Sequence, residues 1–87
     1  RVRDYNFTVF PNPVTADSWI NISTKKAGKI SVTLFDMQGK IVKQLVNTNL
    51  LAGETNVRFD AALLQKGNYV VMMRTAEGTM RKQIVVQ

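Results

Sequence analysis

The chain has 87 residues, which is enough for one domain and too few for two. It contains neither cysteine nor histidine, which excludes disulfides and removes the usual general base and the commonest metal ligand. Twelve basic residues against six acidic ones give a net charge of +6, which either favours anionic partners or only keeps the surface solvated. The basic residues lie scattered, without interleaved aromatic residues, so we expect no nucleic-acid partner. No apolar run is long enough for a transmembrane segment.

Apolar and polar residues alternate with a period of two along most of the chain, and turn residues separate the runs. This pattern predicts an all-β sandwich or barrel. Residues 1–6 are expected to form an N-terminal tether and residues 7–87 a single domain. The seven strands are expected at 7–10, 18–23, 29–35, 40–46, 54–59, 68–74 and 79–87.

The second expected strand raises the question of what Trp19 does. If Ile20 and Ile22 point inward, Trp19 points to the other face of the sheet. An exposed tryptophan is a candidate for stacking on a sugar or anchoring a protein. The alternative is that Trp19 covers the rim of the core.

The middle of the chain predicts a tight hairpin. Residues 29–35 alternate cleanly, and the turn after them begins with Asp36 and ends with Gly39, two residue types that suit a turn. Residues 40–46 alternate less regularly, which indicates a bulge or an edge strand. Residues 47–53 are expected to form a loop.

Two further local predictions concern the second half of the chain. Residues 60–64 are expected to form one helical turn, with Asp60 as its N-cap, ended by Gly67. The methionines are interpreted as gap fillers of the core, and they are Met37, Met72, Met73 and Met80.

The residues that carry chemistry in enzymes are largely missing. The six carboxylates lie far apart in the sequence, and no calcium-loop or phosphate-loop motif is present. The sequence therefore predicts no enzyme, no metal site and no cofactor.

Four motifs follow one another in an order that resembles a known family. They are FPNP at 10–13, LFDMQGKIV at 34–42, LQKGNYVV at 64–71 and KQIVV at 82–86. The set resembles the type A C-terminal sorting domain of the type IX (Por) secretion system of Bacteroidetes. The chain departs from the family pattern in having Gln83 and Gln87 where basic residues are common.

This resemblance implies a fold, a function and partners. The fold implied is a seven-stranded Ig-like antiparallel β-sandwich. The function implied is non-enzymatic: the domain directs its parent protein through the periplasm and the type IX machinery to the outer membrane and cell surface. Sortase machinery then usually removes the domain and joins the cargo to anionic lipopolysaccharide. The alternative implied is an uncleaved docking module of a machinery component that binds anionic lipopolysaccharide. A plain structural spacer is a third alternative.

The resemblance and the turn chemistry together select candidate recognition residues. A small sandwich whose last strand is exposed offers an edge to which a partner strand can pair. Gly39 and Gly67 are expected to act through backbone geometry and Tyr69 through packing, whereas Asp36, Lys40 and Lys82 are expected to contact the partner directly. The full set is Asp36, Gly39, Lys40, Gly67, Tyr69, Lys82, Ile84 and Val86, with Lys43 and Arg81 as candidate anion contacts.

Overall fold

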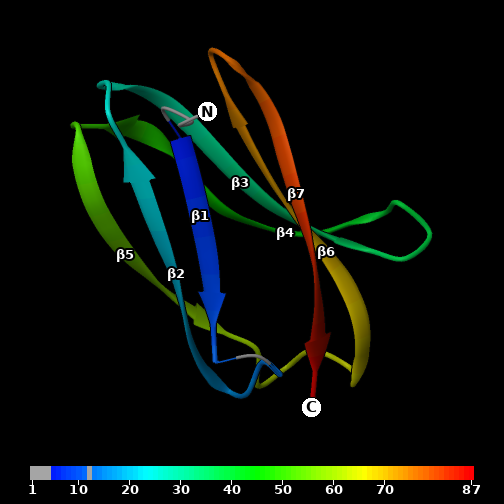
Figure 1. The fold of residues 1–87 in the computed structure, drawn as a ribbon. Coiled ribbons are helices and arrows are strands. Elements are labelled where there is room, and N and C mark those ends of the chain that lie inside the picture. The colour runs from blue at the N-terminus through cyan, green and yellow to red at the C-terminus, as the bar shows by residue number, and fades with distance from the viewer. Residues whose placement is uncertain (1–4, 12) are drawn as a thin grey trace.

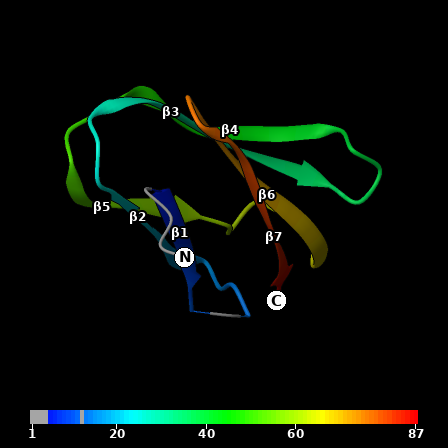
Figure 2. The same ribbon diagram turned by 45° about the horizontal axis from the view of Figure 1, so that its top comes forward.

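The structure is a computed structural model that describes residues 5–11 and 13–87, and its strands form two antiparallel sheets. The smaller sheet has three strands in the order β1-β2-β5, and these are β1 (Tyr5–Phe10), β2 (Asp17–Thr24) and β5 (Gly53–Asp60). The two sheets lie face to face in both views (Figures 1 and 2).

The larger sheet has four strands in the order β4-β3-β6-β7. These are β3 (Gly28–Asp36), β4 (Ile41–Leu50), β6 (Gly67–Thr75) and β7 (Gly78–Val86). Seven strands in two antiparallel sheets confirm the predicted Ig-like β-sandwich. In the described part of the chain, no helix has the length and hydropathy that crossing a membrane would require.

The core is built from alternate residues of each strand, as the period of two requires. Phe7 in β1 and Ile20 and Ile22 in β2 face Val32 and Leu34 of β3, and all are essentially inaccessible to solvent. Trp19 and the other odd-numbered residues of β2 point away from this core, and Trp19 is 41% exposed. The outward direction predicted for Trp19 is therefore confirmed.

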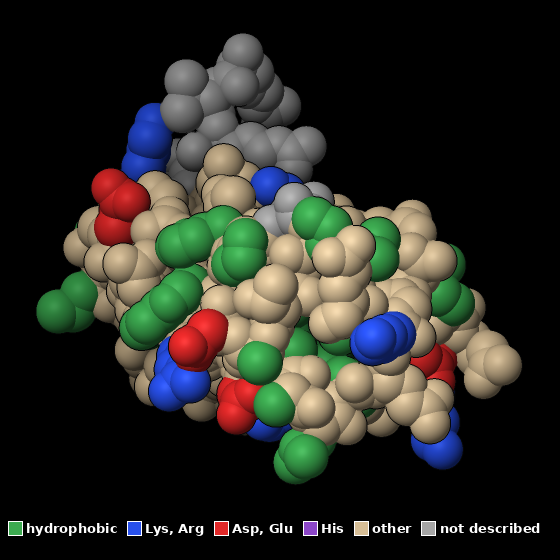
Figure 3. Space-filling view, turned by 90° about the horizontal axis from the view of Figure 1, so that it is seen from below, with side chains coloured by type: hydrophobic (Ala, Val, Ile, Leu, Met, Phe, Trp, Pro, Cys, Tyr) green, Lys and Arg blue, Asp and Glu red, His purple; other side chains and the backbone are tan. Residues whose placement is uncertain are grey.

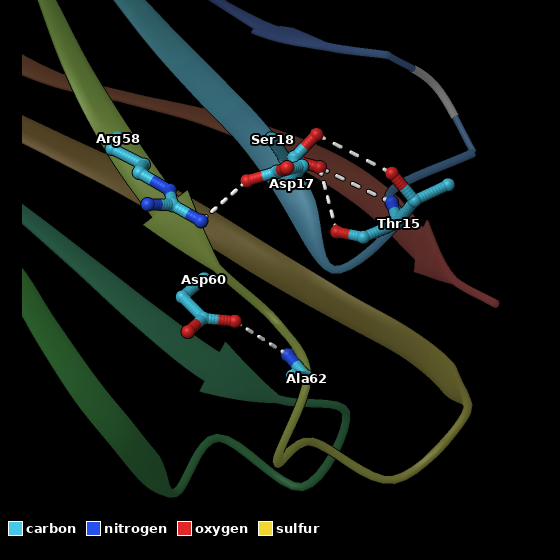
Figure 4. Close-up of polar contacts among 6 residues, drawn as sticks. All are labelled: Thr15, Asp17, Ser18, Arg58, Asp60 and Ala62. Atoms are coloured by element: carbon cyan, nitrogen blue, oxygen red, sulfur yellow. Dashed lines mark hydrogen bonds and ion pairs between the residues drawn. The ribbon is translucent and has the colours of Figure 1, made fainter.

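The last strand, β7, is an edge strand of the larger sheet, as predicted. One end of that edge is closed by Val14, in the connection between β1 and β2. Val14 N donates to Val85 O at 2.7 Å, and Gln87 N donates to Val14 O at 3.0 Å, which makes a parallel bridge. Val14 is fully buried, and the nearby Ser18 hydroxyl donates to Thr15 O at 2.8 Å and so stabilises the same connection (Figure 4).

The prediction for β4 was partly wrong. The expected edge position and irregularity are confirmed, since β4 ends the sheet and its pairing with β3 shifts twice. The strand, however, continues to Leu50, so the expected loop at 47–53 shrinks to residues 51–52. Asn47 and Asn49 have low strand preference, but pairing of residues 47–50 with β3 overrides that preference.

Two other boundaries differ from the prediction. The helical turn expected at 60–64 is a β-turn, in which Leu64 N donates to Ala61 O at 3.1 Å. Asp60 ends β5, and its side chain accepts from Ala62 N as an Asx turn would (Figure 4). β1 begins at Tyr5, which is buried, so the last two residues of the expected tether belong to the sheet. The first four residues of that tether lie outside the described part, as does Asn12.

Candidate recognition surfaces

The turn between β3 and β4 is held by its own backbone and by one carboxylate. Asp36 Oδ1 accepts from the backbone N–H groups of Gln38 and Lys40, both at 2.9 Å. Gly39 N donates to Asp36 O, and Gly39 has a φ of 86°, a conformation that L residues with a side chain rarely adopt. The turn therefore uses Asp36 Oδ1 for its shape, and the Lys40 side chain beside it is exposed.

The tip of this hairpin exposes two apolar side chains, which the sequence analysis missed. Met37 is 57% exposed and Ile41 is 63% exposed, and the hairpin projects beyond the side of the sandwich (Figures 1 and 2). The interpretation as a gap filler is wrong for Met37 and for Met72, which lies on the outer face of β6; Met73 is fully buried and Met80 packs against the core, as expected. We call residues 36–41 the hairpin tip.

The second motif places Gly67 and Tyr69 at the start of β6. Gly67 has a φ of 146°, again in the region that favours glycine. Tyr69 is buried, and its hydroxyl donates to Gln65 O at 2.7 Å, which stabilises the connection between β5 and β6. The buried position of Tyr69 leaves packing and this single hydrogen bond as its contribution.

The residues of the last motif lie mainly inside the molecule. Ile84 and Val86 are buried in the core, and Lys82 shares their face of β7. The Lys82 Nζ atom lies 5.3 Å from the centre of the Phe7 ring, a cation–π contact between the two sheets. Lys82 therefore links the edge strands of the two sheets, β7 and β1, whereas Arg81 points to solvent.

The backbone of β7 has N–H and C=O groups that are open to a partner, although several of its side chains point inward. Alternate residues of a strand turn their N–H and C=O groups to the same side. Because Val85 and Gln87 turn theirs towards Val14, Arg81 and Gln83 turn theirs the same way, away from β6. Within the described residues no strand pairs with β7 on that side before Val85. We call this stretch, residues 79–83, the open edge.

The sheet brings the three motifs together in one line. Asp36 of β3 pairs with Tyr69 of β6, and Tyr69 pairs with Ile84 of β7. The next line across the same strands joins Ile41, Phe35, Val70 and Gln83. Asp36, Tyr69 and Ile84, which are far apart in the sequence, therefore lie on one line across the four-stranded sheet, whereas Lys82 lies two lines away, opposite Val71.

The candidate anion contacts are not brought together. Lys43 pairs with the inward-facing Leu34, whereas Arg81 pairs with Met72 on the outer face. The outer face instead has a shallow open hollow with two cations, which the sequence analysis did not single out. Its lining residues are Lys29, Ser31, Gln44, Asn47, Arg74, Thr75 and Ala76.

A comparison with models of protein families assigns the chain to a family. The model of the secretion system C-terminal sorting domain matches residues 8–87, nearly the whole chain. The chain belongs to this family. A comparison with curated proteins found no match, and neither did one with solved structures.

Family membership gives the sorting domain its general role. The family implies a non-catalytic C-terminal sorting signal for type IX secretion, and delivery to the cell surface or outer membrane by that machinery. The match begins inside β1 and includes all four motifs. The matched residues therefore include the line from Asp36 through Tyr69 to Ile84.

Proposed function

We propose that this chain is a type A sorting domain, recognised by the type IX machinery through the hairpin tip and the open edge together. The observation that carries the proposal is the register Asp36–Tyr69–Ile84, which joins the hairpin to the last strand across one sheet. Recognition follows passage of the parent protein into the periplasm and precedes its delivery to the cell surface. Sortase machinery is then the partner that removes the domain.

The two parts of this surface supply different interactions. The open edge offers backbone hydrogen bonds to an added strand, which give affinity with little sequence information. The hairpin tip offers exposed Met37 and Ile41 beside the cation of Lys40, and apolar side chains with one charge give specificity. A partner of this description presents a strand next to an apolar pocket with an acidic rim.

The open edge is tested with proline. Gln83→Pro removes an N–H that faces away from β6, so the pairing of β6 with β7 is expected to survive. Lys82→Pro, one residue earlier, removes an N–H on the β6 side and is the control that damages the fold. We expect Gln83→Pro to keep its unfolding midpoint near that of the parent while surface delivery falls about tenfold, which corresponds to ~1.4 kcal/mol of lost pairing.

The hairpin tip is tested in the same assay with Ile41→Ser. Leu63→Ser is the matched control, because Leu63 is 99% exposed and lies in the connection between β5 and β6. We expect Ile41→Ser to leave the parent protein in the periplasm and Leu63→Ser to leave delivery unchanged. Normal delivery with folded Gln83→Pro and Ile41→Ser would exclude the proposed surface.

A second function is favoured by one observation, the hollow with Lys29 and Arg74. A retained domain that binds anionic lipopolysaccharide needs cations beside hydrogen-bonding groups, and Ser31, Gln44 and Asn47 supply such groups. This function predicts binding of anionic polysaccharide that weakens with salt and is reduced by Lys29→Glu with Arg74→Glu. Absence of binding at low ionic strength would remove this candidate.

A further inference from the structure

The outer face of the three-stranded sheet carries an aromatic row that lies outside the proposed recognition surface. Phe10, Trp19 and Arg58 lie directly opposite one another across β1, β2 and β5. Phe10 and Trp19 are 42% and 41% exposed, although each is large and apolar. Neighbouring strands are about 5 Å apart, so the two rings form one continuous apolar strip. We call this side of the sheet the aromatic face.

Polar groups surround the strip on the neighbouring lines of the sheet. On one side Asp17 and Asp60 pair across β2 and β5, and Asp17 forms an ion pair with Arg58 (Figure 4). On the other side Asn21 pairs with Thr8 and Asn56. The rings are therefore bordered by carboxylate, guanidinium, hydroxyl and amide groups rather than by further apolar side chains.

The amides beside the strip are held in fixed orientations. Asn21 Nδ2 donates to Asn56 Oδ1 at 2.8 Å and to Glu54 Oε1 at 3.2 Å. No hydrogen bond among the described residues uses the Asn21 amide oxygen or the Asn56 amide nitrogen. One acceptor and one donor are thus preorganised next to Trp19 and available to a ligand.

We infer that the aromatic face binds a neutral saccharide, with a pyranose ring stacked on Trp19 and its hydroxyl groups bonded to Asp17, Asn21 and Asn56. A pyranose ring presents C–H groups on its flat sides, which pack on an aromatic ring, and hydroxyl groups around its rim, which need donors and acceptors. Apolar rings with a polar border offer both kinds of contact at once.

Charge selects against an anionic polymer on this face. Among the described residues of the three strands, Asp17, Glu54 and Asp60 face outward with Arg58 as the one cation, so three carboxylates and one guanidinium leave a charge of −2. The whole chain has a charge of +6, so this face has the opposite sign to the average. A sugar without phosphate or carboxylate groups avoids the repulsion.

The same observations disfavour a protein on this face. The centre of a protein interface is depleted of charged residues and extends over many side chains. Here the apolar area is limited to two rings, with Asp17 and Arg58 immediately beside them.

The test uses the intrinsic fluorescence of Trp19, which is the single tryptophan of the chain. The 87-residue chain, fused to a carrier without tryptophan, is titrated with the neutral hexasaccharides of cellulose, starch, xylan and mannan and with chitotetraose. We expect at least one to shift the emission of Trp19 and to give a dissociation constant by calorimetry. Trp19→Ala is expected to weaken that binding about tenfold or more, and Phe10→Ala less.

Two further variants make the result decisive. Trp19→Phe keeps an aromatic ring and is expected to retain most of the affinity, whereas Asn49→Ala at an exposed position of β4 on the other sheet is expected to change nothing. The inference is overturned if no probe binds at about 10 mM, if Trp19→Ala binds as well as the parent, or if dextran sulfate competes for Trp19. None of these outcomes bears on secretion, so the sorting proposal is judged separately.

Discussion

The outer faces of the two sheets differ in nearly every property that decides binding. The three-stranded sheet shows two aromatic rings among carboxylates and amides. The four-stranded sheet shows aliphatic and basic side chains, with Lys29 and Arg74 around a hollow and Ile41 at the projecting tip. The end where β1 and β7 finish lies between them, and there apolar side chains are mixed with charges of both signs (Figure 3).

This difference teaches that the net charge of a small domain is a poor guide to its surfaces. A chain with a charge of +6 carries a face with a charge of −2. One core lies between two outer faces of different composition. A domain of this size can therefore bind one partner on one face while the other face stays accessible to a second ligand.

The largest expected effect comes from a substitution in the core, because the core supports the outer faces of both sheets. Phe7 is 1% exposed, and Phe7→Ala is expected to lower the free energy of unfolding by about 3–5 kcal/mol. Thr8→Ala, on the same strand but facing outward, is the control and should change it by less than about 0.5 kcal/mol. Urea unfolding measures both, and equal midpoints would contradict the assigned register of β1.

A smaller change affects the four-stranded sheet alone. Gly39→Ala places a side chain at a φ of 86° in otherwise open space, so the cost is backbone strain of about 1–2 kcal/mol and not a clash. We expect the hairpin tip to distort and surface delivery to fall. Saccharide binding at Trp19 should stay at its original affinity, and a parallel loss of both would show that the faces are not independent.

Charge reversal in the hollow tests whether the four-stranded sheet binds an anionic polymer at a defined site. Lys29→Glu with Arg74→Glu is expected to weaken binding of dextran sulfate about tenfold at low salt. Lys25→Glu with Lys66→Glu makes the same change in net charge at exposed loop positions and should have a smaller effect. If the two pairs weaken binding equally, only the total charge matters and the hollow is not a site.

The smallest predicted effect on stability comes from the cation–π contact between the two sheets. Lys82→Gln removes the cation over the Phe7 ring while keeping much of the aliphatic chain, and is expected to cost about 0.5–1 kcal/mol of stability. Arg81→Gln is the neighbouring control and should cost less, since its side chain points to solvent. A thermal midpoint lowered more by Arg81→Gln would reverse the assigned directions of these side chains.

Most of the fold was predictable because six strands obey the period of two. β4 was cut short because an edge strand with shifted pairing buries only Val46, so its sequence carries almost no alternation. The turn after Asp60 lacked the length that distinguishes a helix from a β-turn.

The candidate site was predicted as separate motifs but not as a surface. The pairing of Asp36 with Tyr69 joins strands that are not consecutive, and no local pattern reports such pairing. The inward position of Lys82 was readable, because the alternation that buries Ile84 and Val86 also turns Lys82 inward. The hollow at Lys29 and Arg74 depends on β3 lying beside β6, which only the structure supplies.

The bridge at Val14 sets a limit on the length of any added strand. Its hydrogen bonds occupy the outer side of β7 from Val85 onward. A partner strand can therefore align with about five residues, or about 17 Å, before it meets the first connection of the chain. A longer strand has to displace Val14 from its place in the core. The bridge at Val14 therefore favours short partner strands over long ones by steric exclusion.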